Sequence, residues 1–471
     1  MLHRARWFFA APAVFALLAG CAHRADHAFR VSSVAETASG PTTVPAGDTV
    51  PVPAPVAEPE AAAAEPSKLV LTPATAVDAF DIRFVVTTQS AYGDLFSRTL
   101  DNIVPDYVEA TQVYRGQRAY VIPLIRHYRL NADGCADVVL ELETRKPDGT
   151  RDGDVLRVSL WDGPVVGMGL ILFPKTNVSF WTEANDAHGS YTLIARVIDQ
   201  VSKESREFTH TIVMRDYVPP PLPADFSAAL WYSTYYANPT PELALPALTA
   251  LYWSQPADRR QANMSPLLGF YDQVLLDNPW LLPIFAERLA KADTDEAYVL
   301  SLVLGFHWRK ATAAPPWMDG DTWARLAEFR VHDWNLDADA VITEAGQLEA
   351  LWGRFFANGS YGPIRSLLGP LANYTDLGAG ERWRQARSNE TNPDAPSEIP
   401  PEVKREQLLR STVWALRNNS RQHPLLQAYL NWTLRFGRIP LPQKMFLTRI
   451  LSVETASPGA AATAPIPAPR P

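Results

Sequence analysis

Cysteine is scarce in this sequence, and the short motifs that identify many enzymes are absent. Two of the 471 residues are cysteine, Cys21 and Cys135, so no framework of several disulfides can hold the fold together. The chain contains no H-E-x-x-H, no G-x-S-x-G, no Gly-rich phosphate loop and no C-x-x-C. Beyond residue 76, no two histidines have the i, i+4 spacing of a zinc-binding helix. These absences disfavour an enzyme that depends on a short motif and leave the activity open.

A strong net charge is also lacking, but the charges are unevenly distributed. The chain carries 43 Lys or Arg and 51 Asp or Glu, a net charge of -8, which gives no reason to expect nucleic acid as a partner. Residues 223–349 hold 8 basic and 17 acidic residues, whereas residues 350–455 hold 14 and 8. Two solvated faces of one domain explain this pattern, and so does a partner bound in one orientation.

The N-terminus resembles a bacterial lipoprotein signal. It contains the basic residues His3, Arg4 and Arg6, an apolar run from Trp7 to Leu18 that is too short to span a bilayer, and the tetrapeptide Leu18-Ala19-Gly20-Cys21. The resemblance implies that residues 1–20 are removed and that Cys21 is acylated as the mature N-terminus. Ala22 in place of Asp implies sorting to the outer membrane. The pattern does not determine which face of that membrane the protein occupies, and we expect the periplasmic one. We therefore expect a membrane partner through the lipid anchor.

Composition divides the rest of the chain into five segments. Residues 21–76 are rich in Pro and Ala and are predicted to form a disordered tether, as is the tail at 456–471. Residues 77–217 contain short β-branched and aromatic runs separated by turn residues, which predicts strands. A Pro-rich hinge at 218–224 precedes residues 225–455, where the periodicity becomes helical. The expected fold is multidomain, a β-sandwich followed by an all-α domain.

Eight strands are predicted in the β region: Phe80–Thr87, Arg118–Tyr128, Ala136–Thr144, Val155–Leu160, Val166–Leu172, Val178–Thr182, Ser190–Asp199 and Arg206–Met214. In the seventh, Tyr191, Leu193, Ala195 and Val197 alternate with polar or outward residues, as in a strand with one face in a core. The segment Gly189–Asp199 with Arg206–Met214 resembles the last hairpin of bacterial immunoglobulin-like domains, which implies adhesion, spacing or docking. A helical stretch within Asp94–Val113 has no place in such a fold.

Caps and apolar stripes predict nine or ten helices in the second half. Asp293-Thr294-Asp295-Glu296 is a capping-box-like start for a helix at Ala297–Trp308. Further helices are expected at Val403–Arg417, Gln347–Phe356 and Leu425–Phe436. Three similar tetrapeptides, beginning at Tyr236, Leu276 and Phe356, are 40 and 80 residues apart, a spacing typical of helix-pair repeats.

Two local patterns suggest ligand sites. Residues 333–344 resemble an EF-hand calcium loop with Asp333, Asn335, Asp337 and Glu344 as oxygen ligands, although Ala338 stands where that loop needs glycine. The alternative is ordinary capping of the next helix by acidic residues. Eleven of the fourteen tryptophans lie in the helical half. Most are expected in the core, whereas Trp317 and Trp334, beside turn residues, are expected to be exposed and could stack on a sugar or an apolar peptide.

The function that these observations favour is a lipid-anchored, non-catalytic binding or scaffold protein for an envelope complex. One alternative is a hydrolase of cell-wall glycan that uses a pair of carboxyl groups far apart in the sequence. The other is a calcium-dependent adhesive module. Apart from calcium, no cofactor is expected.

Overall fold

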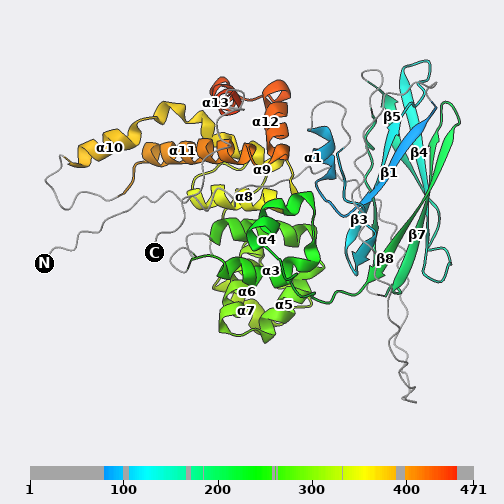
Figure 1. The fold of residues 1–471 in the computed structure, drawn as a ribbon, viewed down its shortest axis with the longest axis horizontal. Coiled ribbons are helices and arrows are strands. Elements are labelled where there is room, and N and C mark those ends of the chain that lie inside the picture. The colour runs from blue at the N-terminus through cyan, green and yellow to red at the C-terminus, as the bar shows by residue number, and fades with distance from the viewer. Residues whose placement is uncertain are drawn as a thin grey trace, which may run out of the picture.

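The structure is a computed structural model that describes residues 79–98, 105–165, 171–183, 185–256, 260, 264–330, 332–388 and 398–452. Cys21, the predicted tether and the predicted tail lie outside the described residues. A β-rich region with two sheets comes first along the chain, and a helical region follows it (Figure 1). The order of the two regions is therefore as predicted.

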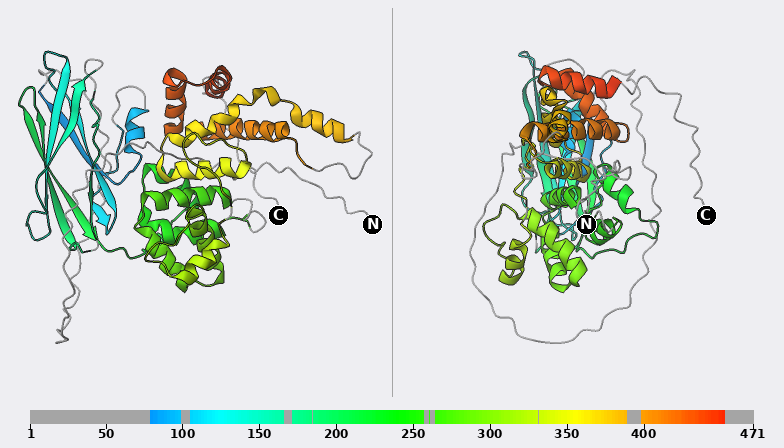
Figure 2. Two further views of the ribbon diagram at one scale, coloured as in Figure 1. Left: turned by 180° about the vertical axis from the view of Figure 1, so that it is seen from behind. Right: turned by 90° about the vertical axis from the view of Figure 1, so that its left-hand side faces the viewer.

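The β-rich region contains a three-stranded and a five-stranded sheet. The smaller sheet has the order β1 (Asp81–Thr87), β3 (Arg118–Arg126), β6 (Val178–Trp181). The larger sheet has the order β2 (Gln112–Tyr114), β8 (Ser205–Arg215), β7 (Gly189–Asp199), β4 (Cys135–Arg145), β5 (Leu156–Pro164). All neighbouring strands pair antiparallel except β2 and β8, which are parallel. Figure 2 shows the strands from two further sides.

Alternating burial along β7 explains how this strand holds the core. Tyr191, Leu193, Ala195 and Val197 are buried, with exposed fractions of at most 1%, and the residues between them are more exposed. The alternation predicted from the sequence is thus confirmed. One apolar cluster contains these side chains together with residues of β1, β3 and β6, so the two sheets share a core.

Some features of this region differ from expectation or lie outside the described residues. The predicted strand Val166–Leu172 overlaps residues 166–170, which are not described. The short strand β2 was not predicted, and helix α1 (Tyr92–Ser97) forms at the start of the stretch that had no predicted place. Cys135 is a free thiol and is partly exposed.

The helical region begins at α2 and extends to α13. Its helices are α2 (Ala228–Thr234), α3 (Ala244–Trp253), α4 (Met264–Asp277), α5 (Leu281–Lys291), α6 (Thr294–His307), α7 (Gly320–Ala327), α8 (Ala345–Asn358), α9 (Gly362–Leu367), α10 (Ala379–Ser388), α11 (Pro401–Ser420), α12 (Pro424–Phe436) and α13 (Leu441–Ser452), with short 3-10 turns at Tyr235–Ala237, Pro241–Leu243, Gly369–Ala372 and Tyr374–Asp376. The predicted cap is confirmed: the Asp293 carboxylate accepts a hydrogen bond from the Glu296 backbone N–H at 3.0 Å and starts α6.

Helices α4 and α8 form the centre of this region and lie against each other in parallel. Asp272 contacts Arg354, 82 residues further along the chain, and Asp277 contacts Asn358, 81 residues further along. A nearly constant offset of this kind is expected only for helices that run in the same direction. The helices approach closely because Gly269 faces the backbone of Ala350 and Gly353 faces the backbone of Pro266. The tetrapeptides that begin at Leu276 and Phe356 thus lie side by side. A helix-pair repeat that extends over the whole region stays a prediction.

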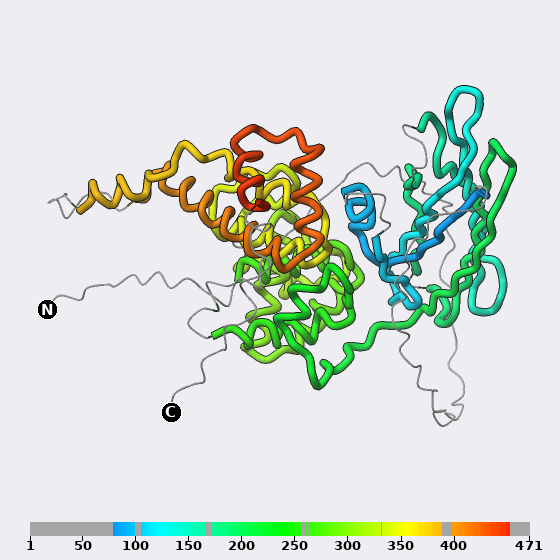
Figure 3. The backbone as a smooth tube through the Cα atoms, turned by 45° about the horizontal axis from the view of Figure 1, so that its top comes forward, coloured from blue at the N-terminus to red at the C-terminus, as the bar shows by residue number. Residues whose placement is uncertain are grey.

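Helix α1 connects the two regions (Figure 3). The Asp94 carboxylate accepts a hydrogen bond from the Tyr361 backbone N–H at 2.9 Å. The Arg98 guanidinium lies 4.4 Å from the ring centroids of both Tyr361 and Trp432, which is close enough for cation–π attraction. The β-rich and helical regions are therefore packed together through the segment that the strand pattern could not accommodate.

Candidate functional site

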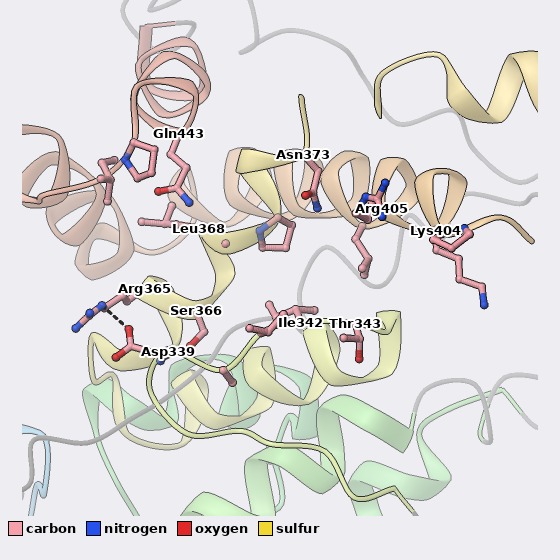
Figure 4. A pocket seen from close by; sticks show the side chains of 18 of the residues that line it. Asp339, Ile342, Thr343, Arg365, Ser366, Leu368, Asn373, Lys404, Arg405 and Gln443 are labelled. Atoms are coloured by element: carbon pink, nitrogen blue, oxygen red, sulfur yellow. Dashed lines mark hydrogen bonds and ion pairs between the residues drawn. The ribbon is translucent and has the colours of Figure 1, made fainter. Parts of the chain in front are cut away.

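A groove of about 630 Å³ opens between the segment 339–343, helix α9, the start of α11 and the turn before α13 (Figure 4). We call it the cationic groove. Its lining includes four basic side chains, Arg365, Lys404, Arg405 and Arg438, and one acidic side chain, Asp339. The volume lies within the range of small-ligand or peptide sites.

The segment 339–343 is held in place by side chains rather than by a helix or strand. The Gln347 amide donates to the carbonyl of Val341 at 3.1 Å, and its oxygen accepts from the Thr343 backbone N–H at 3.0 Å. Ser366 on α9 accepts from the Asp339 N–H at 3.1 Å. These hydrogen bonds fix the wall of the cationic groove and turn Val341 outward, where 80% of its surface is exposed.

The positive charges lie at opposite ends of the cationic groove. In Figure 4, Arg365 lies at one end and is paired with Asp339 at 2.6 Å, while Lys404 and Arg405 lie at the other. Arg405 is paired with Asp376 at 2.6 Å. Among the described residues no ion pair is formed by Arg438. A carboxylate or phosphate entering the groove would find a guanidinium that is not neutralised, because arginine binds such groups through paired N–H donors.

The floor between these charges is apolar. It is formed by Ile342, Leu368, Leu408 and Ile439, together with Pro370, Pro401 and Pro440. A surface that combines apolar side chains with an excess of basic ones suits a peptide segment carrying both apolar and acidic residues. The geometry therefore supports binding of such a segment.

A smaller hollow of about 380 Å³ shares Val341 and Thr343 with the cationic groove. Its lining includes three of the four predicted calcium ligands, Asp333, Asn335 and Glu344. The fourth, Asp337, is not part of this lining. The structure thus brings the predicted calcium residues beside the cationic groove, a proximity that their sequence pattern did not indicate.

Two of the four residues proposed as calcium ligands accept hydrogen bonds from the protein through a side-chain oxygen. Asn335 Oδ1 accepts from the Asp337 N–H at 3.0 Å, and Glu344 Oε2 accepts from the Trp334 indole at 3.1 Å. The backbone of Asp339, rather than that of Ala338, takes a positive φ of 74°. Within the ranges that the structure describes, no group of three His, Cys, Asp or Glu could hold a metal ion. Calcium binding stays a prediction.

The two tryptophans expected at the surface differ. Trp317 is 46% exposed, as expected. The prediction that Trp334 is exposed was wrong, because only 7% of its surface is accessible. His332 stacks on its ring at 4.2 Å, and Gly346 leaves room for the indole at the start of α8. Turn residues in the sequence showed that the chain bends here, but they could not show that the bend folds the ring inward.

The residues of the cationic groove were not singled out by motif analysis. Arg365 and Arg438 are separated by 73 positions in the sequence, and no spacing rule connects them. The signal that was available is the excess of basic residues in 350–455. The structure places four of these basic residues around one hollow, so part of the excess positive charge is concentrated at this surface.

Three carboxyl groups elsewhere have a raised pKa. Burial raises the pKa of Glu242, Asp277 and Glu349, that of Glu349 to about 7. Asp277 is also hydrogen-bonded by the Asn358 amide at 3.0 Å. None of the three lines the cationic groove or the smaller hollow as the structure describes them. A raised pKa is a property of a general acid, but these groups do not face each other across the groove.

Replacement of Glu349 by glutamine tests the pKa shift through stability. Because the pKa in the folded protein is raised from 4.5 to about 7, the contribution of this group is present below pH 4.5 and is lost as the pH rises through 7. We expect Glu349→Gln to leave the unfolding free energy unchanged at pH 4 and to increase it by about 1–3 kcal/mol at pH 8. Urea unfolding at both pH values measures this. Glu398→Gln, at a side chain 84% exposed, should show no such difference; an equal effect of the two substitutions would contradict the prediction.

Comparison with known proteins leaves the family open. No family model and no curated protein matches the sequence. Among solved structures, a family 123 glycoside hydrolase from Clostridium perfringens is similar with a TM-score of 0.19 and 10% identity, over 41% of this chain and 36% of that chain. An immunoglobulin-like protein from Pseudomonas aeruginosa is similar with a TM-score of 0.16 and 13% identity, over 30% of this chain and 100% of that chain. At these scores neither similarity indicates a function. Of the described helices, none is both long enough and apolar enough to cross a bilayer.

Proposed function

We propose that the protein is an outer-membrane lipoprotein, anchored through Cys21 on the periplasmic side, that binds an envelope partner without catalysis. In this proposal the cationic groove holds an acidic segment of the partner protein. The β-rich region is an immunoglobulin-like sandwich that serves as a spacer or second docking body. The apolar cluster shared by its two sheets supports this assignment.

The observation that carries the proposal is the arrangement of charge and apolar surface in the cationic groove. Arg438 has no ion-pair partner among the described residues, and the apolar floor lies open between the charged ends. Charged groups around an apolar centre steer a partner and set its orientation. A scaffold needs such directed binding, and it needs no catalytic group in the groove.

Capture of the tagged full-length chain from crosslinked cells tests the proposed binding. We expect one envelope protein to be recovered reproducibly. Lys404→Glu combined with Arg438→Glu should lower its recovery by roughly tenfold or more, because like charges then face the acidic segment. The matched control is Lys291→Glu with Arg384→Glu, two exposed positions outside the groove that change the net charge equally. Equal recovery with both variants would contradict the groove as the binding site.

Two further results would refute other parts of the proposal. Hydrolysis of purified cell wall that a single carboxyl substitution abolishes would show that the protein is an enzyme. Release of the chain from membranes by salt washing, without any attached lipid at Cys21, would show that it is not a lipoprotein. Neither result depends on the groove variants, so the three parts can fail separately.

A further inference from the structure

Helix α13 presents an outer face with two exposed apolar side chains in its first half, the polar Thr448 in line with them, and basic residues at its sides. Leu441 and Met445, one turn apart, are 70% and 65% exposed. Gln443, Leu447 and Ile450 are buried on the opposite side. With 100° per residue, Lys444 falls on one flank of the exposed pair and Arg449 on the other. The face thus has the composition of a helix that lies in a membrane interface.

Exposed apolar and basic residues also occur in the segments next to α13. Phe436, at the end of α12, is 56% exposed. Residues 401–452 contain nine Lys or Arg and two Glu, an excess of seven positive charges. One of these glutamates, Glu406, is already paired with Arg410 at 2.6 Å. Lys444 and Arg449 form no ion pair within the described part of the chain. Helices α12 and α13 lie together at the outer edge of the helical region (Figure 1).

We propose that the outer face of α13 docks on an anionic phospholipid surface. Leu441 and Met445 enter the boundary between headgroups and acyl chains, and Lys444 and Arg449 reach outward to lipid phosphates. Positive charge explains the preference for anionic lipid over a neutral apolar partner. The inference goes beyond the proposed function, because it concerns a surface outside the cationic groove and needs no acylated cysteine.

A single face of this kind binds a membrane weakly. Its binding free energy matters when it adds to that of a second contact between the protein and the membrane. Each basic residue near an anionic surface contributes about 1 kcal/mol, equivalent to roughly a fivefold change in partition coefficient. A second membrane contact also restricts how a protein can turn relative to the bilayer. Docking through α13 would hold the helical region beside the membrane and set the direction in which the cationic groove opens.

Vesicle co-sedimentation tests the proposal with residues 22–471, which include every residue that the structure describes and exclude both Cys21 and the apolar signal segment. The probes are vesicles of phosphatidylcholine alone and of phosphatidylcholine mixed with phosphatidylglycerol. We expect binding to the mixed vesicles that weakens as salt is added. Lys444→Gln with Arg449→Gln should lower the partition coefficient by roughly ten- to thirtyfold. Leu441→Ser with Met445→Ser should lower it by at least about tenfold.

Matched controls separate a specific face from general charge or hydrophobicity. Lys291→Gln with Arg384→Gln removes the same charge from exposed positions elsewhere. Val218→Ser with Leu230→Ser removes exposed apolar side chains that are 76% and 59% accessible. Both controls should bind as the parent chain does, and thermal unfolding should be the same for all five proteins because the changed side chains lie at the surface.

Three outcomes would overturn the proposal. The first is that the parent chain does not sediment with the mixed vesicles. The second is that the α13 variants and the control variants lose binding equally. Light scattering could instead show a dimer that only Leu441→Ser with Met445→Ser disrupts, which would assign the face to a second copy of the chain. Since the tested chain cannot be acylated, none of these results depends on whether Cys21 is an anchor.

Discussion

Replacement of Gly353 by alanine is expected to unfold the helical region or to lower its stability severely. A Cβ atom at this position would lie 1.9 Å from the backbone oxygen of Pro266 and 2.6 Å from the backbone nitrogen of Phe270. Backbone atoms of α4 cannot rotate away as a flexible side chain can, so α4 and α8 must separate. Overpacking of a core typically costs 1–3 kcal/mol, and we expect at least about 3 kcal/mol here because the clash is between two helix backbones.

Gly269→Ala should behave in the same way, since its Cβ would lie 1.9 Å from the Ala350 oxygen. The control is Gly320→Ala at the start of α7, where an added Cβ meets no atom within 4 Å. The control should be neutral or stabilise slightly, because alanine favours the helix and restricts the unfolded chain. Urea unfolding followed by tryptophan fluorescence measures both. Equal stability of Gly353→Ala and Gly320→Ala would show that the two helices do not approach as closely as the structure indicates.

The second large loss of stability is expected at a buried cluster of charged side chains that includes Asp272 of α4 and Arg354 of α8. Asp272 on α4 receives hydrogen bonds from Arg354 at 2.5 and 3.2 Å, from Arg309 at 3.2 Å, and contacts the His307 ring nitrogen at 3.1 Å. The four side chains are 2–8% exposed. Burial alone would raise the pKa of Asp272, but Arg354, His307 and Arg309 hold it well below its usual range. The carboxylate is therefore charged in the folded protein and compensates two buried guanidinium groups.

Asp272→Asn should lower the unfolding free energy by about 3–5 kcal/mol, because it keeps the shape of the side chain but leaves Arg354 and Arg309 buried without a counter-charge. Urea unfolding at neutral pH measures the loss. The control Glu287→Gln removes a carboxylate from an ion pair in which both side chains are 67% exposed, and it should cost less than about 1 kcal/mol. A loss at Asp272 no greater than at Glu287 would mean that the cluster contributes no more than a surface ion pair.

Secondary structure in the second half of the chain could be predicted because it depends on local patterns. Asp293 caps α6 in the structure as the sequence indicated. The same applies to the alternation in β7. Caps, stripes and alternation require only neighbours within one helical turn or one strand, and such neighbours are set by the chain itself.

Helix α1 shows where local patterns were insufficient. Its stretch was recognised as helical but had no place in a sheet region. In the structure its Asp94 and Arg98 side chains contact Tyr361 and Trp432 of the helical region. These partners are more than 260 positions away, and a single sequence contains no periodicity that would connect them. Tyr92 and Leu95 of the same helix are buried in one apolar cluster with Val85 of β1 and Ile122 of β3, so α1 packs on both regions.

The sequence by itself determined that strands precede helices, approximately where four of the helices begin, and that positive charge concentrates after residue 350. Only the tertiary structure decided that Arg365, Lys404, Arg405 and Arg438 surround one groove, that Asp272 is compensated by two distant arginines, and that Trp334 turns inward. The reason is physical. Local elements follow from hydrogen bonds and apolar periodicity between near neighbours, whereas a site depends on which faces of those elements meet, and that is settled by packing across the whole core.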